Sequence, residues 1–173
     1  TEVVLENVRV PRSAVIGEVG QGMSIALNAL NLSRAFISTL AVGIMQRALD
    51  EAVAYAKQRK QFGRRLIDFE MVQAMLADMA IKTEAARVLV NNSMRQMDAG
   101  EMVRKDGAIV KTFVTDAMQE VVSNAVQVLG GYGYSEEYPV EKLMRDAKIF
   151  QIFEGSNQIQ RMTIAKELDR EYR

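Results

Sequence analysis

Apolar residues recur every three or four positions over most of the chain, which is the pattern of one face of an α-helix. The first helical segment runs from about Met23 to about Arg59. Its apolar residues at helical spacing are Ile25, Ala29, Leu32, Phe36 and Leu40. A second segment begins near Asp68, a good N-cap, and Gly100 closes it. Its stripe has the spacing of a bundle seam and comprises Phe69, Val72, Leu76, Met79, Thr83, Ala86 and Val90.

The rest of the chain continues the helical pattern. The further segments are, in chain order, roughly residues 102–129, 139–148 and 157–171. The inward positions of the first of these are Val110, Val114, Ala117, Val121, Ala125 and Val128. Gly130-Gly131 stops that helix, and Pro139 suits the first turn of the short helix that follows. After a break at 152–156, Ser156 or Asn157 caps the last helix. The pattern predicts an all-α fold, an antiparallel four-helix bundle.

The first ten residues have a different pattern. Val3–Val10 is rich in β-branched residues and partly alternating, which predicts a strand. A single strand has no partner in a helical domain, so we expect further sequence upstream of it.

Composition narrows the chemistry. Apolar residues make up 49% of the chain and charged residues 25%, as in globular proteins, and 22 Lys and Arg balance 22 Asp and Glu. We therefore expect no binding to nucleic acid, and no uncharged stretch is long enough to predict a membrane span. The absence of Cys and His excludes thiolate nucleophiles, Ser-His triads and nearly all zinc sites. We expect no metal site, and any catalysis must use a carboxylate, Tyr, Lys or a cofactor.

Glu154 is the first candidate for such chemistry, because it lies beside Gly155 in the break before the last helix. The unpaired N–H groups of a helix start can bind an oxygen anion, and the apolar residues before Glu154 would keep its carboxylate basic. Glu154 is then a general base. Alternatively, it only interacts favourably with the helix dipole.

Three other windows suggest ligand contacts. Residues 55–65 place five cations around one helix end, which suits either the helix dipole or a pyrophosphate. Residues 127–134 carry three glycines after a helix, and a C-cap explains only the first or second of them. Arg34 lies mid-helix among apolar residues, where it either meets a buried anion or extends to the edge of the bundle. Both interpretations of each window remain open on this evidence.

Taken together, the windows resemble motifs of the acyl-CoA dehydrogenase family, in the family's order. Residues 59–63 look like its R-x-Q-F-G motif, and residues 72–79 look like V-Q-x-x-L-A-D-M. Residues 127–146 are similar to the stretch G-G-x-G-Y…P-V-E-[KR]…R-D. Residues 151–161 are similar to the signature I-[YF]-E-G-[TS]-x-x-I-Q-R. Each motif alone is weak to moderate evidence, but together they are very specific.

The resemblance implies that the chain is the C-terminal bundle of a flavoprotein with three domains. Residues 1–20 would be the end of the middle β-domain and a linker, and residues 21–173 the helical bundle. Family members are usually homotetramers, or dimers of dimers, and hold FAD between domains and between subunits. Their usual electron acceptor is electron-transferring flavoprotein. The implied location is the bacterial cytoplasm or, alternatively, the mitochondrial matrix.

The implied reaction is α,β-dehydrogenation of an acyl-CoA thioester, in which Glu154 removes the Cα proton while a hydride leaves Cβ for the flavin. By the same alignment, the residues that contact FAD would be Arg59, Gln61, Phe62, Gln127, Gly130, Gly131, Ser156 and Gln158. The acyl-CoA site would be lined by Asn31, Arg34 and Gly155. The family often has Asp in place of Asn31 and Gln in place of Glu70. Its isovaleryl and long-chain members carry the base where Ser33 stands, so this sequence follows the short- and medium-chain arrangement.

Two alternatives accompany the dehydrogenase hypothesis. One is a related flavoprotein with other chemistry, either an acyl-CoA reductase or a DNA-damage-response type, and the zero net charge argues against the latter. The other is a non-catalytic helical interaction module, which gives no reason for Glu154-Gly155 at a helix break. Under the dehydrogenase hypothesis we expect the 173 residues alone to be inactive, because the β-domain that shields the flavin is absent.

Overall fold

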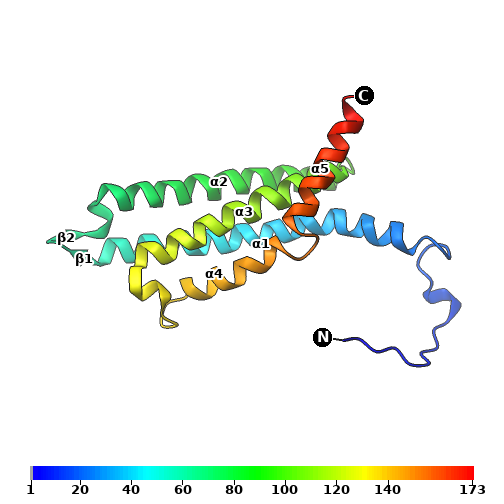
Figure 1. Ribbon diagram of the computed structural model, residues 1–173, viewed down its shortest axis with the longest axis horizontal. Helices are drawn as coiled ribbons and strands as arrows, with labels where there is room; N and C mark the ends of the chain where they lie inside the picture. Colours follow the sequence, from blue (N-terminus) through cyan, green and yellow to red (C-terminus); the bar gives the residue numbers. More distant parts are fainter. Residues whose placement is uncertain (1) are drawn as a thin grey trace.

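The computed structural model describes residues 2–173 and confirms the all-α fold. Its main body is a bundle of helices that alternate in direction, crossed at one end by a further helix (Figure 1). The bundle comprises α1 (Gly22–Gln58), α2 (Glu70–Asp98), α3 (Arg104–Leu129) and α4 (Val140–Lys148), and α5 (Asn157–Glu171) is the crossing helix. Short 3-10 turns lie at η1 (Arg12–Ala14), η2 (Leu66–Asp68), η3 (Gly130–Tyr134) and η4 (Ile149–Gln151).

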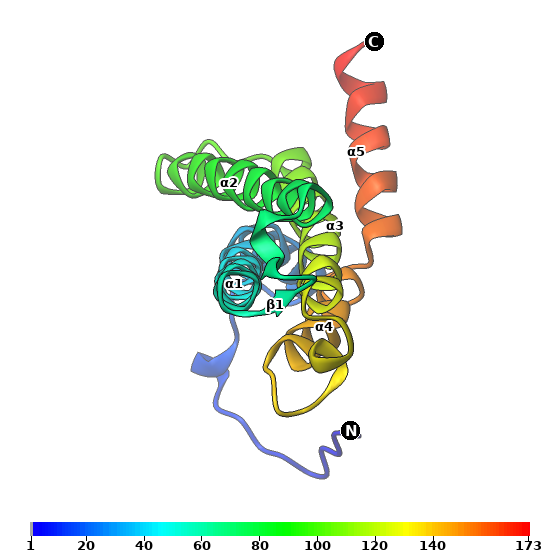
Figure 2. The ribbon, with the colours of Figure 1, turned by 90° about the vertical axis from the view of Figure 1, so that its left-hand side faces the viewer.

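α3 lies at the centre of the bundle and packs against α1, α2, α4 and α5 (Figure 2). All the positions predicted to face inward from this helix are buried: Val110, Val114, Ala117, Val121, Ala125 and Val128. The seam of α2 is likewise buried over Leu76, Met79, Thr83, Ala86 and Val90. Steps of three and four residues keep these side chains on one face, so the core follows the sequence pattern.

α1 confirms the first predicted helix, but its apolar stripe is not the face that the bundle buries. Leu32, Phe36 and Leu40 are 44%, 51% and 63% exposed. The buried face consists mainly of small residues, among them Ala35, Ala41, Ala48 and Ala52. Small side chains allow the neighbouring helices to approach closely, and the larger apolar residues of α1 remain on the surface of this chain.

A window of 18 residues in α1 has a mean hydropathy of 1.4, which passes a length-and-composition test for a membrane-spanning helix. Core helices of bundles pass the same test. The buried face of α1 carries Arg34 and Ser38, and that face packs against α2 and α3. The bundle covers only this face, and 28% of the window is buried among the described residues.

The predicted strand at Val3–Val10 is wrong. These residues form irregular, exposed chain, and between residues 2 and 21 the structure has only the short turn η1 as regular structure up to the start of α1. A strand needs a neighbour for its backbone N–H and C=O groups, and among the described residues the only ladder is a hairpin far along the chain.

That hairpin joins α1 to η2 and was not predicted. β1 (Lys60–Gln61) pairs antiparallel with β2 (Arg64–Arg65), and the turn residues Phe62 and Gly63 both have positive φ, 52° and 79°. Two-residue hairpin turns favour this left-handed backbone. The prediction of Asp68 as the N-cap of α2 is also wrong, because Phe69 holds that position.

Candidate active site

The break between α4 and α5 brings Glu154 back against α1. Glu154 and Gly155 have φ angles of 56° and 85°, so the chain turns sharply before Ser156 caps α5. The half-buried Glu154 carboxylate accepts a hydrogen bond of 2.7 Å from the hydroxyl group of Ser33 on α1. Because this bond directs the carboxylate towards α1 and not towards the N–H groups of α5, the helix-dipole interpretation does not describe the geometry.

Arg34 lies beside this carboxylate, and neither open interpretation of Arg34 describes it fully. Its side chain is buried, at 5% exposure, and donates to the Asn31 amide oxygen at 2.9 Å and to the Glu154 carbonyl at 3.5 Å. Burial lowers the pKa of Arg34 and so does Arg104, whereas Glu154 raises it. The guanidinium is thus buried, but its hydrogen-bond partners are an amide and a backbone carbonyl.

Gly107 allows α3 to approach α1 closely at this site. A Cβ atom on Gly107 would lie 2.9 Å from the Asn31 carbonyl oxygen and 3.8 Å from the Cβ of Arg34. Only glycine permits this approach, and the approach places α3 behind the Glu154 loop.

A buried network behind the loop was not singled out from the sequence. Lys111, at 0% exposure, donates to the Gly155 carbonyl at 3.0 Å and to the Asn157 amide oxygen at 2.7 Å. Asn157 donates in turn to Asp116 at 2.7 Å. Burial lowers the pKa of Lys111 to about 8. The signal was present in the sequence, because Lys111 is a lone cation in a largely apolar stretch, which is the same feature that drew attention to Arg34.

Ser156 and Gln158, two predicted cofactor contacts, line a pocket of about 440 Å³ at the start of α5. The rest of its lining is Asp116, Lys148, Gln151, Ile152, Asn157 and Arg161. Burial alone would raise the pKa of Asp116, but hydrogen bonds from Arg161, Asn157 and Gln151 lower it below its ordinary value. The one carboxylate of this pocket is therefore paired with Arg161, and the Ser156 hydroxyl is already engaged as the helix cap.

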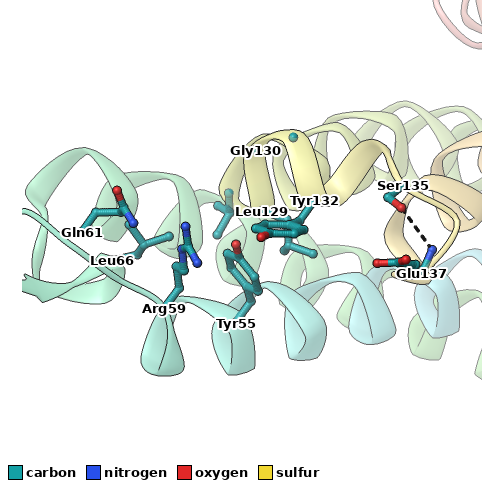
Figure 3. Close-up of a pocket in the computed structure, with 11 residues that line it drawn as sticks. Tyr55, Arg59, Gln61, Leu66, Leu129, Gly130, Tyr132, Ser135 and Glu137 are labelled. Atoms are coloured by element: carbon teal, nitrogen blue, oxygen red, sulfur yellow. Dashed lines mark hydrogen bonds between the residues drawn. The ribbon is translucent and has the colours of Figure 1, made fainter.

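A second pocket, of about 550 Å³, lies at the opposite end of the bundle (Figure 3). It brings together the predicted cofactor contacts Arg59, Gln61, Gly130 and Gly131. Tyr132 and the end of α1 form neighbouring walls, and the Arg59 guanidinium stands 5.4 Å from the centre of the Tyr132 ring.

Gly131 provides a test of whether this pocket fits an extended ligand such as a dinucleotide. Unlike Gly130, which caps α3 with a φ of 63°, Gly131 has no positive φ. A Cβ atom on Gly131 would meet nothing within 4 Å. Nothing among the described residues therefore requires glycine there, and the missing side chain leaves room for a ligand to lie close to the backbone.

Two further cations of residues 55–65 have local partners, and two other predicted cofactor contacts lie outside this pocket. Of the cations in residues 55–65, Arg65 pairs with Asp68 and Arg64 lies 3.9 Å from the centre of the Phe69 ring, so local partners account for both. Two predicted contacts lie outside the lining of the second pocket, which we call the Arg59 pocket. They are Phe62, at 92% exposure, and Gln127, which is also exposed.

The predicted site residues thus form groups at two ends of the bundle. Arg34 and Arg59 both belong to the α1 region, and about 37 Å separates them at the helical rise of about 1.5 Å per residue. Within one chain, the Arg59 pocket and the Glu154 carboxylate do not share one compact site.

Comparison with known proteins gives consistent matches. A family profile described as "Acyl-CoA dehydrogenase, C-terminal domain" matches residues 20–168. The probable acyl-CoA dehydrogenase FadE25 of Mycobacterium tuberculosis is 48% identical over 97% of this chain and 43% of its own length. The caffeyl-CoA reductase-Etf complex subunit CarC of Acetobacterium woodii is 42% identical over 95% of this chain and 44% of its own length.

Among solved structures, butyryl-CoA dehydrogenase from Megasphaera elsdenii superposes with a TM-score of 0.93 and 44% identity, over 95% of this chain and 43% of that one. The chain thus spans less than half the length of the relatives that it matches.

Proposed function

Because this chain belongs to the acyl-CoA dehydrogenase family and matches its C-terminal domain, we propose that it supplies the catalytic base and part of the FAD site of an enzyme that dehydrogenates acyl-CoA thioesters. The observation that carries the proposal is the direction of the Glu154 carboxylate, which is turned towards α1 beside Ser33 and Arg34. The short- and medium-chain arrangement places the base at Glu154 and leaves Ser33 where other members of the family carry it. The contact between Ser33 and Glu154 shows that these two positions are neighbours in space.

In the proposed reaction the Glu154 carboxylate accepts the proton from the substrate Cα while a hydride leaves Cβ. FAD, when bound, supplies the acceptor for that hydride. No acceptor among residues 2–173 takes the backbone N–H of Glu154, so this group can donate to the thioester carbonyl as negative charge develops there. Asn31, Arg34 and Gly155 would line the acyl-CoA site and help to position the thioester.

For the cofactor, we propose that Arg59, Gln61, Gly130 and Gly131 hold one part of FAD in their pocket, with Phe62 and Gln127 at its edge. Ser156 and Gln158 would contact FAD at the start of α5. The distance between the two groups supports an oligomer, such as the expected homotetramer, in which these contacts come from different subunits. Electron-transferring flavoprotein is the proposed electron acceptor, because a relative is a subunit of an Etf complex.

The experiment is anaerobic mixing of the full-length flavoprotein with butyryl-CoA or octanoyl-CoA while the flavin absorbance is followed. We expect bleaching, and absence of bleaching with every acyl-CoA tried would remove the proposal. Glu154→Gln is expected to retain FAD and lose at least about 10³-fold in the rate of bleaching, as loss of a general base should.

A matched control for Glu154→Gln is Glu84→Gln, because the Glu84 side chain is 68% exposed on α2 and pairs only locally with Arg87. It should react like the wild type. A Glu154→Gln rate within tenfold of that control would reject the role of Glu154 as the base.

Reduction of an enoyl-CoA is the second candidate, favoured by the similarity to a caffeyl-CoA reductase subunit. In that direction the Glu154 carboxyl group would return a proton to Cα. Measurement of the rates in both directions with the same protein would decide which one the enzyme favours.

A further inference from the structure

The loop that carries Glu154 is held through its backbone carbonyl groups. The side-chain amide of Gln160 donates to the carbonyl oxygens of both Glu154 and Gly155, at 3.1 and 3.0 Å. Lys111 donates to the Gly155 carbonyl at 3.0 Å, and Arg34 reaches the Glu154 carbonyl at 3.5 Å. Both carbonyls therefore point into the bundle, and buried donors fix the loop from inside.

This arrangement is costly in free energy. Glu154 has left-handed backbone, with a φ of 56°, which a residue other than glycine adopts only at a cost in conformational free energy. The Lys111 ammonium is fully buried, yet its hydrogen bonds go to a backbone carbonyl and to the Asn157 amide, and neither acceptor is a carboxylate. Gln160 is fully buried as well, and its Oε1 atom has no partner among the described residues. Strain and imperfectly paired polar groups of this kind persist mainly at functional sites.

We propose that Lys111 and Gln160 are positioning residues for the base. They hold the carbonyls of Glu154 and Gly155 inside the bundle, so that the Glu154 carboxylate is directed at Ser33 on α1. The inference rests on the proposed function and deepens it, because it assigns a role to side chains that act on the substrate only through the loop.

The electrostatics of Lys111 agree with this role. The pKa of Lys111 is lowered to about 8, mainly by burial and also by Arg34, although Asp116 on α3 and Glu154 on the loop act to raise it. The neutral amine still has two N–H donors for its two acceptors. The hydrogen bonds therefore persist in either protonation state, and they are what a substitution must remove.

The test uses the full-length flavoprotein and Lys111→Met, which removes both hydrogen bonds with a side chain of similar length. Single-turnover bleaching by acyl-CoA reports two quantities, the rate constant and the amplitude. We expect the rate constant to fall about 10²-fold, as misplacement of a reacting group does, with the full amplitude retained. A purely structural fault would lower the amplitude and leave the rate constant of the surviving sites unchanged.

Thr112→Val is the matched control, because Thr112 is the buried neighbour of Lys111 and its hydroxyl has no partner among the described residues. Its rate should equal that of the wild type. Gln160→Met is the second variant and decides the matter if Lys111→Met fails to fold: a similar loss of rate supports the inference, and an unchanged rate overturns it.

The result with the wild-type enzyme distinguishes a failure of the proposed function from a failure of the positioning role of Lys111 and Gln160. If the wild type does not bleach, both the proposed function and this inference fall. If it bleaches and Lys111→Met keeps its rate, only the inference falls.

Discussion

Gly155 lies between the proposed base and α5, in a conformation and a space that both exclude a side chain. Its φ is 85°, and an added Cβ atom would lie 2.5 Å from the Gln160 amide nitrogen that binds the loop carbonyls. Gly155→Ala must therefore displace Gln160 and also accept a backbone strain of about 1–2 kcal/mol. We predict a fall of at least about tenfold in the single-turnover rate of flavin reduction, with FAD retained.

Gly43→Ala is the control for this substitution. Gly43 lies on the exposed side of α1, and an added Cβ atom would meet nothing within 4 Å. Alanine is favoured over glycine in a helix by roughly 0.5–1 kcal/mol, so this variant should melt at the wild-type temperature or slightly above it, with an unchanged rate. Equal rates for the two alanine variants would contradict the prediction.

At the scale of single residues, the sequence indicated groups with unusual neighbours but not the contacts that hold them. Glu154 and Arg34 were identified because a carboxylate at a helix break and a cation in an apolar helix each require an explanation. Gln160 was missed, because a glutamine in the first turns of a polar helix looks solvent-exposed. Its burial depends on how α5 crosses the bundle, and no local pattern encodes that crossing.

The hairpin of β1 and β2 holds an exposed aromatic residue in an unfavourable backbone conformation. Phe62 is 92% exposed with a φ of 52°, where asparagine is preferred in turns of this kind. Among residues 2–173 its only contact with another ring is edge-on to Phe69, with the ring centres 6.4 Å apart. We predict that Phe62→Asn leaves the melting temperature of the apoprotein unchanged or higher, yet weakens FAD binding several-fold, as loss of about 1 kcal/mol of aromatic contact would.

Fluorescence titration of the apoprotein with FAD measures this affinity. Tyr172→Asn serves as the control, because Tyr172 is equally exposed, at 86%, near the end of α5 and away from both pockets. If Phe62→Asn binds FAD as tightly as Tyr172→Asn, the hairpin aromatic does not touch the cofactor.

At the scale of elements, periodicity identified every long helix, because a stripe of apolar residues records which face is buried. It failed where elements are short or depend on a partner. The strands at 60–65 are two residues each, too short to carry a period of two. Val3–Val10 has the composition of a strand, but composition does not provide the neighbouring strand. Asp68 is a good cap in isolation, yet its carboxylate is already bound to Arg65.

At the scale of the whole molecule, the apolar stripe of α1 did not predict which face of this helix the bundle buries. Leu32, Phe36 and Leu40 keep helical spacing, yet this chain leaves them largely exposed and buries small residues. A sequence pattern states that a face is apolar, but it does not state whether the same chain, another domain or another subunit covers it. Because the chain spans less than half the length of its relatives, surface of this kind is where further domains or subunits would pack.

The separation of the two groups of site residues leads to a prediction for the assembled enzyme. About 37 Å lies between Arg34 and Arg59 along α1, so one complete site would take Glu154 from one subunit and Arg59 from its neighbour. Arg59→Ala and Glu154→Gln subunits would each be inactive alone. If the two are co-expressed with different tags and pair symmetrically, one site in each mixed pair is fully wild type and the other carries both changes.

With random pairing, half of the pairs are mixed, and about a quarter of all sites should therefore regain wild-type activity. Purification through both tags isolates the mixed assemblies, and the amplitude of single-turnover bleaching counts their working sites. A mixture with no more activity than the separate variants would mean that Arg59 and Glu154 serve the same subunit's flavin. The length of α1 between the two ends would then have to be spanned within one chain, and the proposed sharing of the FAD site would be abandoned.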